Sequence, residues 1–317
     1  SEVFETSEVS PMINFQNLLL YTTTVLIWGL TWIAIKFQLG DVDPLLSVTY
    51  RFALASVLLL AFSRFTGRKL RFTRREHFYM ALQGVFLFSV NYWLVYAAEL
   101  HVTSGLVAIV FSTIVFMNVI VGALFIGAPV RPQVVFGASL GLLGVGLLFW
   151  PEVVGISLSD AAVLGLLLGL GGTLSASLGN ITSARNQRAG LPVVQTNAFG
   201  MGYGALLMFL VAAITDAPIT FTPTVAYVGS LFYLSIFGSV LAFGAYLTLI
   251  GRIGADKASY SSMLFPLVAL FISTLVEDYR WSAPALVGVA LILAGNFLVL
   301  TRRRRALPAA ATTAAAD

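Results

Sequence analysis

The chain has 317 residues, of which 58% are hydrophobic and only 10% are charged, and its net charge is +4. Soluble domains carry about 25% charged residues, so this composition, with a mean hydropathy of +0.92, excludes a soluble globular protein and predicts an integral membrane protein. The sequence has no cysteine, which excludes disulfides and thiolate metal sites.

The chain divides into long apolar runs joined by short polar loops. Residues 1–11 are polar and acidic, and we interpret them as leftover expression sequence or a disordered N-terminus outside the fold. An apolar helix needs about 20 residues to cross the hydrocarbon core. Runs of this length predict ten transmembrane helices, at 17–37, 44–64, 77–98, 103–126, 132–150, 160–180, 192–214, 224–248, 257–276 and 282–301.

Positive charge sets the expected orientation. Most of the 18 Lys and Arg residues fall on one side of the ten-span arrangement, including the clusters at 64–75 and 302–305. Loops rich in Lys and Arg stay in the cytoplasm. We therefore expect both termini to be cytoplasmic, with 302–317 forming a basic and then alanine-rich tail.

The two halves of the chain share a weak pattern. Residues 96–127 align with 246–277 at an offset of 150 residues, matching Tyr96 with Tyr246 and Ser112 with Ser262. Halves with an odd number of spans enter the membrane in opposite directions. The expected fold is all-α, with inverted five-helix repeats at 12–158 and 159–301 and a substrate site near the midplane between them.

Three motifs resemble one family of transporters. The segments WGLTWIAIK at 28–36, YRF at 50–52 and YAAEL at 96–100 are similar to motifs of the EamA family, in the drug/metabolite transporter superfamily. The resemblance implies ten helices in two inverted halves and a small-molecule substrate moved across the bacterial inner membrane. Within the family, the span-one motif and the aromatic third span look most like bacterial exporters of aromatic amino acids.

The third span carries polar and aromatic residues that an apolar helix in lipid does not need. Tyr92 and Tyr96 are four residues apart and share one face, and Asn91 needs a partner or water. This pattern fits the wall of a polar cavity or contacts between helices. Trp28 and Trp32 share a face of the first span in the same way.

Other polar groups complete the expected site. Arg51 is either a receptor for a substrate carboxylate or a structural anchor, and Lys36 guides an anion or extends to the interface. Pro266 interrupts the ninth span and suggests a gate. The expected substrate-binding residues are Trp28, Trp32, Asn91, Tyr92, Tyr96, Ser112, Ser177, Tyr246 and Tyr260.

The acidic residues limit the energy source. All 14 lie in loops, tails or span ends, and Glu99 alone could reach a cavity. A proton antiporter needs a buried carboxylate, so we expect facilitated diffusion or exchange of an uncharged or zwitterionic substrate.

Known enzyme motifs are missing from the sequence. It contains neither a phosphate-binding G-x-x-x-x-G-K-[ST] loop nor H-E-x-x-H or G-x-S-x-G. We therefore expect no catalytic residues, no cofactor and no metal. The tail arginines indicate topology rather than nucleic-acid binding, so the expected partners are the lipid bilayer and a small-molecule substrate, and the protein is a monomer or a homodimer.

Aromatic amino-acid export is the leading interpretation, and it has rivals. The first is export of another small neutral or zwitterionic metabolite or drug, with possible proton coupling. A membrane enzyme would need a buried set of His, Asp or Glu, which the sequence lacks. In a receptor subunit, the polar third span would bind a partner protein.

Overall fold

The described part of the first half consists of helices joined by short loops. The structure is a computed structural model that describes residues 14–38, 42–156, 159–276 and 281–301. Its first-half elements are α1 (Phe15–Lys36), α2 (Pro44–Phe65), α3 (Arg74–Val85), the π-helical η1 (Phe86–Val90), α4 (Asn91–Glu99), α5 (Ser104–Ser112), α6 (Ile114–Ile126), α7 (Pro132–Leu148) and the short α8 (Trp150–Val154).

The second half repeats this order of long helices. Its elements are α9 (Asp160–Arg188), α10 (Val193–Ile214), α11 (Val225–Tyr233), the π-helical η2 (Leu234–Leu241), α12 (Ala242–Ile253), α13 (Ala255–Ala258), the 3-10 segment η3 (Ser259–Leu264), α14 (Phe265–Val276) and α15 (Ala283–Leu300). The expected all-α fold is confirmed for the described residues.

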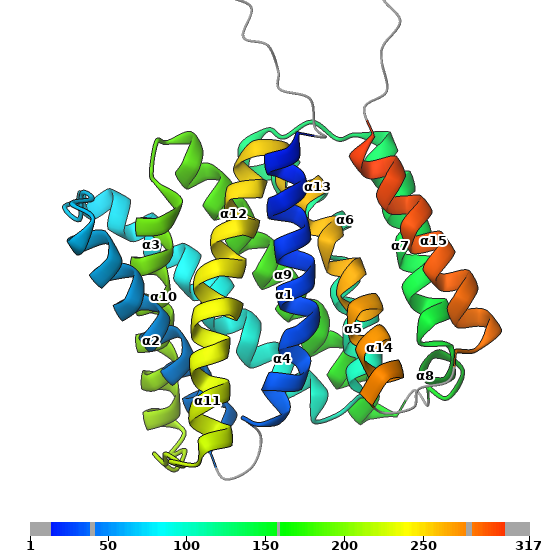
Figure 1. The fold of residues 1–317 in the computed structure, drawn as a ribbon, viewed down its shortest axis with the longest axis horizontal. Helices are drawn as coiled ribbons and strands as arrows, with labels where there is room; N and C mark the ends of the chain where they lie inside the picture. The colour runs from blue at the N-terminus through cyan, green and yellow to red at the C-terminus, as the bar shows by residue number, and fades with distance from the viewer. Residues whose placement is uncertain (1–13, 39–41, 157–158, 277–280, 302–317) are drawn as a thin grey trace, which may run out of the picture.

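Seven helices are long and apolar enough to cross a membrane among the residues that the structure describes. They are 44–65, 74–99, 104–126, 160–188, 193–214, 225–253 and 283–300, and the apolar helix 132–148 is shorter. The count of ten spans stays a prediction. The start of α1 and the end of α15 lie at the same end of the helix bundle (Figure 1). The expectation that both chain termini are cytoplasmic stays a prediction.

Local sequence explains where the helices begin and end. Asp43 accepts a hydrogen bond from the Leu45 amide and precedes Pro44, which suits the first turn of α2. Thr73 and Glu76 form a capping box at the start of α3. Gly127 ends α6 with a φ of 61°, a left-handed conformation that glycine adopts without strain.

Two predicted spans are longer in the structure. The predicted end of the sixth span was residue 180, whereas α9 continues to Arg188. The predicted end of the eighth was residue 248, whereas α12 continues to Ile253. On α9 the predicted span stopped where polar residues become frequent, and polar residues continue a helix as readily beyond the hydrocarbon core. On α12 the apolar Leu249 and Ile250 follow the predicted end, so that end was placed too early.

Irregular segments occupy matching positions in the two halves. Shifted by 150 residues, η1 (Phe86–Val90) falls inside η2 (Leu234–Leu241). The break between α5 and α6 at Thr113 falls, after the same shift, inside η3. π-Helical bulges are rare in proteins, and those that occur often lie at functional sites. We therefore look for the functional site next to these segments.

Glycines permit close packing of α7 on α15 at one edge of the bundle (Figure 1). A Cβ atom on Gly144 would lie 2.6 Å from the Gly288 carbonyl oxygen, which no side chain tolerates. Gly137 and Gly295 approach each other in the same way. The fifth and tenth spans therefore use their small residues on each other, while α1, α9 and α12 occupy the middle of the bundle.

Candidate functional site: a central aromatic cavity

A cavity of about 210 Å³ lies between the two halves of the chain. Its wall comes from α1, α2, η1, α4, α5 and α6 of the first half and from α9, α12, η3 and α14 of the second. Ligand pockets for drug-sized molecules have about 300–1,000 Å³, so this cavity suits a small metabolite.

Trp28 anchors one aromatic wall. Its ring packs edge-on against Phe243, Tyr246 and Phe265, with centroid distances of 4.8, 5.1 and 5.4 Å. Its indole Nε1 donates a hydrogen bond to the Gly238 carbonyl oxygen at 3.0 Å. That carbonyl lies in η2, where the π-helical winding disturbs the regular hydrogen-bond ladder. The bulge thus holds the indole in one orientation.

Arg51 lies in the cavity wall and is 5% exposed. Its Nε donates to Ser239 Oγ at 2.8 Å, and Ser235 Oγ donates to the Arg51 carbonyl oxygen at 3.1 Å. A Cβ atom on Gly238 would lie 3.0 Å from Nη2 of Arg51, so glycine at this position of η2 leaves room for the guanidinium. The second-half bulge therefore positions both Trp28 and Arg51.

Aromatic rings surround the guanidinium. Its central carbon lies 5.3 Å from the centroid of Phe52 and 5.5 Å from that of Tyr92. In the part of the chain that the structure describes, Arg51 forms no ion pair. Glu99 also lines the cavity, and it too lacks an ion pair with a described residue. A buried cation with neutral partners attracts an anionic group.

Two buried amides in the wall have an unused acceptor. Asn91 is 7% exposed and Asn180 is 1% exposed, and the Oδ1 atom of each lacks a hydrogen-bond partner in the described structure. Asn180 Nδ2 donates to the Tyr246 hydroxyl at 3.0 Å, which fixes the orientation of this amide. An unpaired buried acceptor costs about 1–3 kcal/mol, so both oxygens favour a ligand that carries N–H donors.

Besides Glu99, the cavity collects seven of the expected site residues. They come from five helical segments that are far apart in the chain, and they are Trp28, Arg51, Asn91, Tyr92, Tyr96, Tyr246 and Pro266. Pro266 follows the 3-10 segment η3, so the ninth helix is irregular where the proline was expected to interrupt it.

Three expected binding residues lie away from the cavity. Ser112 is turned back to its own helix, where its hydroxyl donates to the Ala108 carbonyl at 2.8 Å. Tyr260 reaches α7 and α15, and its hydroxyl donates to the carbonyls of Gly137 and Ile292. Ser177 is fully buried outside the cavity wall. These three side chains do not line the cavity, and their role in substrate binding stays a prediction.

Trp32 and Lys36 were also expected at the site, but the structure does not describe their side chains. Conversely, Asn180, Phe243 and Phe265 line the cavity and were not among the expected binding residues. A signal for one of them exists in the sequence, because Phe243 precedes Tyr246 by three residues and shares its helical face.

The EamA-like transporter family model matches residues 17–150 and 163–301. The chain is 29% identical to the uncharacterized inner membrane transporter YedA of Escherichia coli K12 over 287 residues, covering 86% of this chain and 89% of YedA. It is 26% identical to the uncharacterized transporter YoaV of Bacillus subtilis 168 over 278 residues, covering 87% and 94%.

A further relative, from Escherichia coli K12, is named a probable amino-acid metabolite efflux pump and is 25% identical over 282 residues, covering 86% of this chain and 91% of the pump. A crystal structure with 19% identity superposes with a TM-score of 0.74 and covers 90% of this chain and 96% of its own, which shows the same fold. These names indicate transport rather than catalysis, and the protein is a multi-pass protein of the bacterial inner membrane. The chain belongs to the EamA-like transporter family.

Proposed function

We propose that the protein exports amino acids, with aromatic amino acids as its main substrates, by alternating access through the central cavity. Transport is facilitated diffusion or exchange, without a coupled ion. The observation that carries this proposal is the composition of one cavity wall. It combines aromatic rings, a buried guanidinium without an acidic partner among the described residues, and two unpaired amide oxygens.

Each part of an aromatic amino acid finds a complementary group. Its carboxylate pairs with Arg51, because charge-assisted hydrogen bonds to a guanidinium are strong in a dry site. Its ammonium group donates to the Oδ1 atoms of Asn91 and Asn180, which have no other donor in the described structure. Its ring packs against Trp28 and Tyr92, where edge-on aromatic contacts add about 0.5–1.5 kcal/mol to the burial of apolar surface.

The substrate class is supported from two sides. One relative is named an amino-acid metabolite efflux pump. The aromatic preference rests on the ring-lined cavity and on the resemblance to the bacterial aromatic amino-acid exporter YddG. Export, rather than uptake, rests on the same resemblance.

Alternating access follows from two inverted repeats, 12–158 and 159–301, that rock about the cavity. This arrangement is supported by the two separate matches of one family model and by the irregular segments at matching positions. The oligomeric state is monomer or homodimer. In either state the glycine faces of α7 and α15 pack on each other within one chain.

The test is transport by the purified protein in liposomes. We expect saturable uptake of labelled phenylalanine without any ion gradient, competed by tryptophan and tyrosine and only weakly by alanine. Counterflow, in which unlabelled phenylalanine inside the liposome accelerates entry of the label, would establish exchange. Absence of phenylalanine transport under every gradient, with transport of another metabolite, would refute the aromatic assignment and leave the family unchanged.

A second candidate is proton-coupled export of another small neutral or zwitterionic metabolite or drug. It is favoured by Glu99, a carboxylate in the cavity wall without an ion-pair partner among the described residues. Uptake that requires an imposed pH gradient, and that Glu99→Gln abolishes, would support this candidate over facilitated diffusion.

A further inference from the structure

A second cavity of about 580 Å³ lies at the end of the bundle where α1 begins. We call it the vestibule. It is bounded by α6, the loop before α7, the C-terminal ends of α9 and α12, and α13. By the distribution of positive charge, this is the expected cytoplasmic end.

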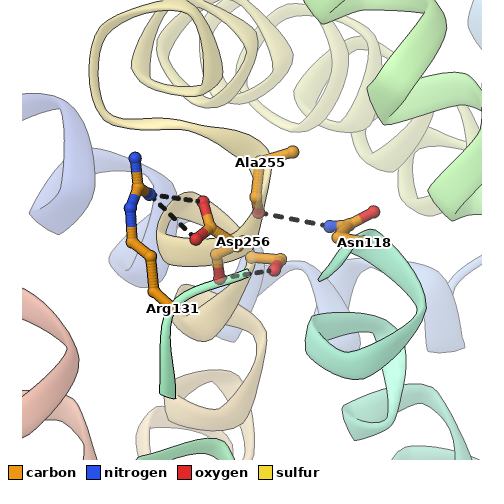
Figure 2. Close-up of polar contacts among 5 residues, drawn as sticks. Asn118, Arg131, Ala255 and Asp256 are labelled. Atoms are coloured by element: carbon orange, nitrogen blue, oxygen red, sulfur yellow. Dashed lines mark hydrogen bonds and ion pairs between the residues drawn. The ribbon is translucent and has the colours of Figure 1, made fainter. Parts of the chain in front are cut away.

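Three arginines from three different parts of the chain meet at the vestibule. They are Arg131 before α7, Arg188 at the end of α9 and Arg252 in the last turn of α12. Arg131 pairs with Asp256 of α13 at 2.9 Å (Figure 2). The sequence presents these cations as separate topology signals, whereas the fold brings them around one cavity.

Two of the three arginines have only neutral partners in the described structure. Arg188 donates to the Ile126 carbonyl oxygen at 2.7 Å. Arg252 donates to Gln16 Oε1 at 3.0 Å and to Asn17 Oδ1 at 3.3 Å, across from its own half of the chain to α1. Arg188 and Arg252 are exposed, so both form the rim through which solutes enter. Uncompensated cations at a cavity mouth concentrate anions.

The floor of the vestibule carries an unpaired acceptor. Asn118 is 1% exposed and its Nδ2 donates to the Ala255 carbonyl oxygen at 3.2 Å, an arrangement that Figure 2 shows beside Asp256. Its Oδ1 has no partner among the described atoms. Asp256 is half-buried nearby, and its carboxylate, which Arg131 already contacts, keeps further acceptor capacity. The vestibule thus has cations at its rim and both an amide oxygen and a carboxylate at its floor.

The vestibule and the central cavity lie on one axis. α6 contributes Ile114 to the central cavity and Asn118 to the vestibule. One helical turn spans about 5.4 Å, so these two walls are one turn apart. α12 contributes Tyr246 and Thr248 in the same order.

A thin partition separates the two spaces. On α9, Asn180 faces the central cavity and the next residue, Ile181, faces the vestibule. The bond from Asn180 to the Tyr246 hydroxyl closes the partition from the central side.

We propose that the vestibule is a second binding site, which receives the zwitterionic head group of an amino acid before the amino acid passes to the central cavity. The carboxylate lies between Arg188 and Arg252, and the ammonium group donates to Asn118 Oδ1 and to Asp256. This assignment rests on the proposed amino-acid substrate, which it deepens by naming an entry site. An anionic lipid head group would also bind the arginines, but its phosphate has no N–H donor for Asn118 Oδ1.

The absence of cysteine from the sequence makes the site directly testable. Thr248→Cys introduces one thiol into the vestibule wall at a half-buried position. The full-length variant, reconstituted in phosphatidylcholine liposomes, reacts with a membrane-impermeant methanethiosulfonate. We expect L-phenylalanine to slow this reaction most, because it carries both the carboxylate and the ammonium group. 3-Phenylpropionate, which has only the carboxylate for the arginines, should slow it less. Phenethylamine, which lacks the carboxylate, should leave it unchanged.

The arginines are tested in the same background. Arg188→Gln and Arg252→Gln should raise the phenylalanine concentration needed for half-protection by about tenfold. Arg75→Gln, an exposed arginine of α3 outside the vestibule, should not. Loss of the Ile126 contact could weaken the fold, so unchanged melting temperature in Arg188→Gln is the companion measurement, and Arg188→Lys should restore part of the protection. Equal half-protection in both glutamine variants and the parent would overturn the proposal.

Two comparisons separate the remaining explanations. Tyr92→Ala, in the central cavity, should leave protection of the introduced thiol in place, and if it abolishes protection the thiol reports movement caused by the central site and the proposal fails. Protection that appears only in liposomes with phosphatidylglycerol would assign the vestibule to lipid. An anionic methanethiosulfonate should react with the introduced thiol faster than a cationic one. The ratio of the two rates should fall in Arg188→Gln. Neither result depends on which substrate is transported. If the anionic reagent reacts faster as expected while phenylalanine neither protects the thiol nor is transported, the proposed function and the amino-acid assignment of the vestibule both fail, and only an affinity of the vestibule for anions remains.

Discussion

Arg51 is held in the membrane interior by a neutral hydroxyl, with its Nε 2.8 Å from Ser239 Oγ. The serine belongs to η2 of the second half, whereas the arginine belongs to α2 of the first. The contact therefore joins the two halves at the cavity and leaves the positive charge without an acidic partner among the described residues. This arrangement makes Arg51 the strongest candidate for the carboxylate receptor.

Replacing Arg51 should separate substrates by their carboxylate. Arg51→Gln should lower the kcat/KM for phenylalanine by roughly tenfold to a hundredfold, because a hydrogen bond to a charged group contributes about 1.5–3 kcal/mol. Transport of phenethylamine, if any, should change much less. The measurement is initial uptake into liposomes, with Ser239→Ala as a milder companion that frees the guanidinium without removing it. Equal losses for both substrates would show that Arg51 serves only the fold.

The aromatic wall of the third span gives a second prediction. Tyr92→Ala and Tyr96→Ala should each reduce phenylalanine transport about tenfold while expression and melting temperature stay near those of the parent, because both rings line the cavity. Trp93→Ala is the matched control, since Trp93 lies between them on the same helix but is 43% exposed on the outer surface of the bundle. Parental rates in both tyrosine variants would remove these rings from the binding site.

Asn91 and Ser177 form an instructive pair. Both were expected in the site, both are buried and both have an unpaired oxygen in the described structure, but only Asn91 lines the cavity. Asn91→Ala should therefore raise the KM for amino acids severalfold, because the substrate ammonium loses an acceptor. Ser177→Ala should leave the KM unchanged. A KM that rises equally in both variants would indicate a general effect of removing polar groups from the bundle.

The sequence predicted most of the fold because the membrane imposes a simple rule. A crossing helix must satisfy its own backbone and present apolar side chains, and these requirements produce runs whose limits can be read directly. The errors fall where the rule ends, as at Arg188, which continues α9 after its apolar run has finished. The π-helical segments had no signal in the composition.

The site was only partly predictable, for a geometric reason. A polar residue in a span indicates a need for a partner but not its direction. Tyr92 and Tyr96 both line the cavity, because two residues four apart define one helical face. Tyr260 had no such companion, and its hydroxyl finds the carbonyls of Gly137 and Ile292 instead. The direction of such a side chain depends on helices that lie far from it in the sequence.

Packing of α7 on α15 gives a stability prediction. Gly144→Ala should lower the melting temperature in detergent, because its Cβ would lie 2.6 Å from the Gly288 carbonyl oxygen and neither backbone can yield easily. Overpacking of this kind costs about 1–3 kcal/mol. Gly146→Ala is the control two residues away, where a Cβ meets nothing within 4 Å, and it should be neutral or slightly stabilising because alanine favours a helix. An equal loss at both positions would show that helix geometry, not the contact, is responsible.

The coupling argument depends on Glu99, the carboxylate at the end of α4 that reaches the cavity wall. We expect Glu99→Gln to keep downhill phenylalanine transport within about twofold of the parent and to show no response to an imposed pH gradient, because facilitated diffusion needs no proton carrier. Glu76→Gln is the matched control on the same long helical segment, since glutamine preserves the capping box with Thr73. The measurement compares uptake with and without the gradient. If uptake by the parent requires the gradient, and Glu99→Gln abolishes that uptake while Glu76→Gln does not, Glu99 carries the proton and the transporter is an antiporter.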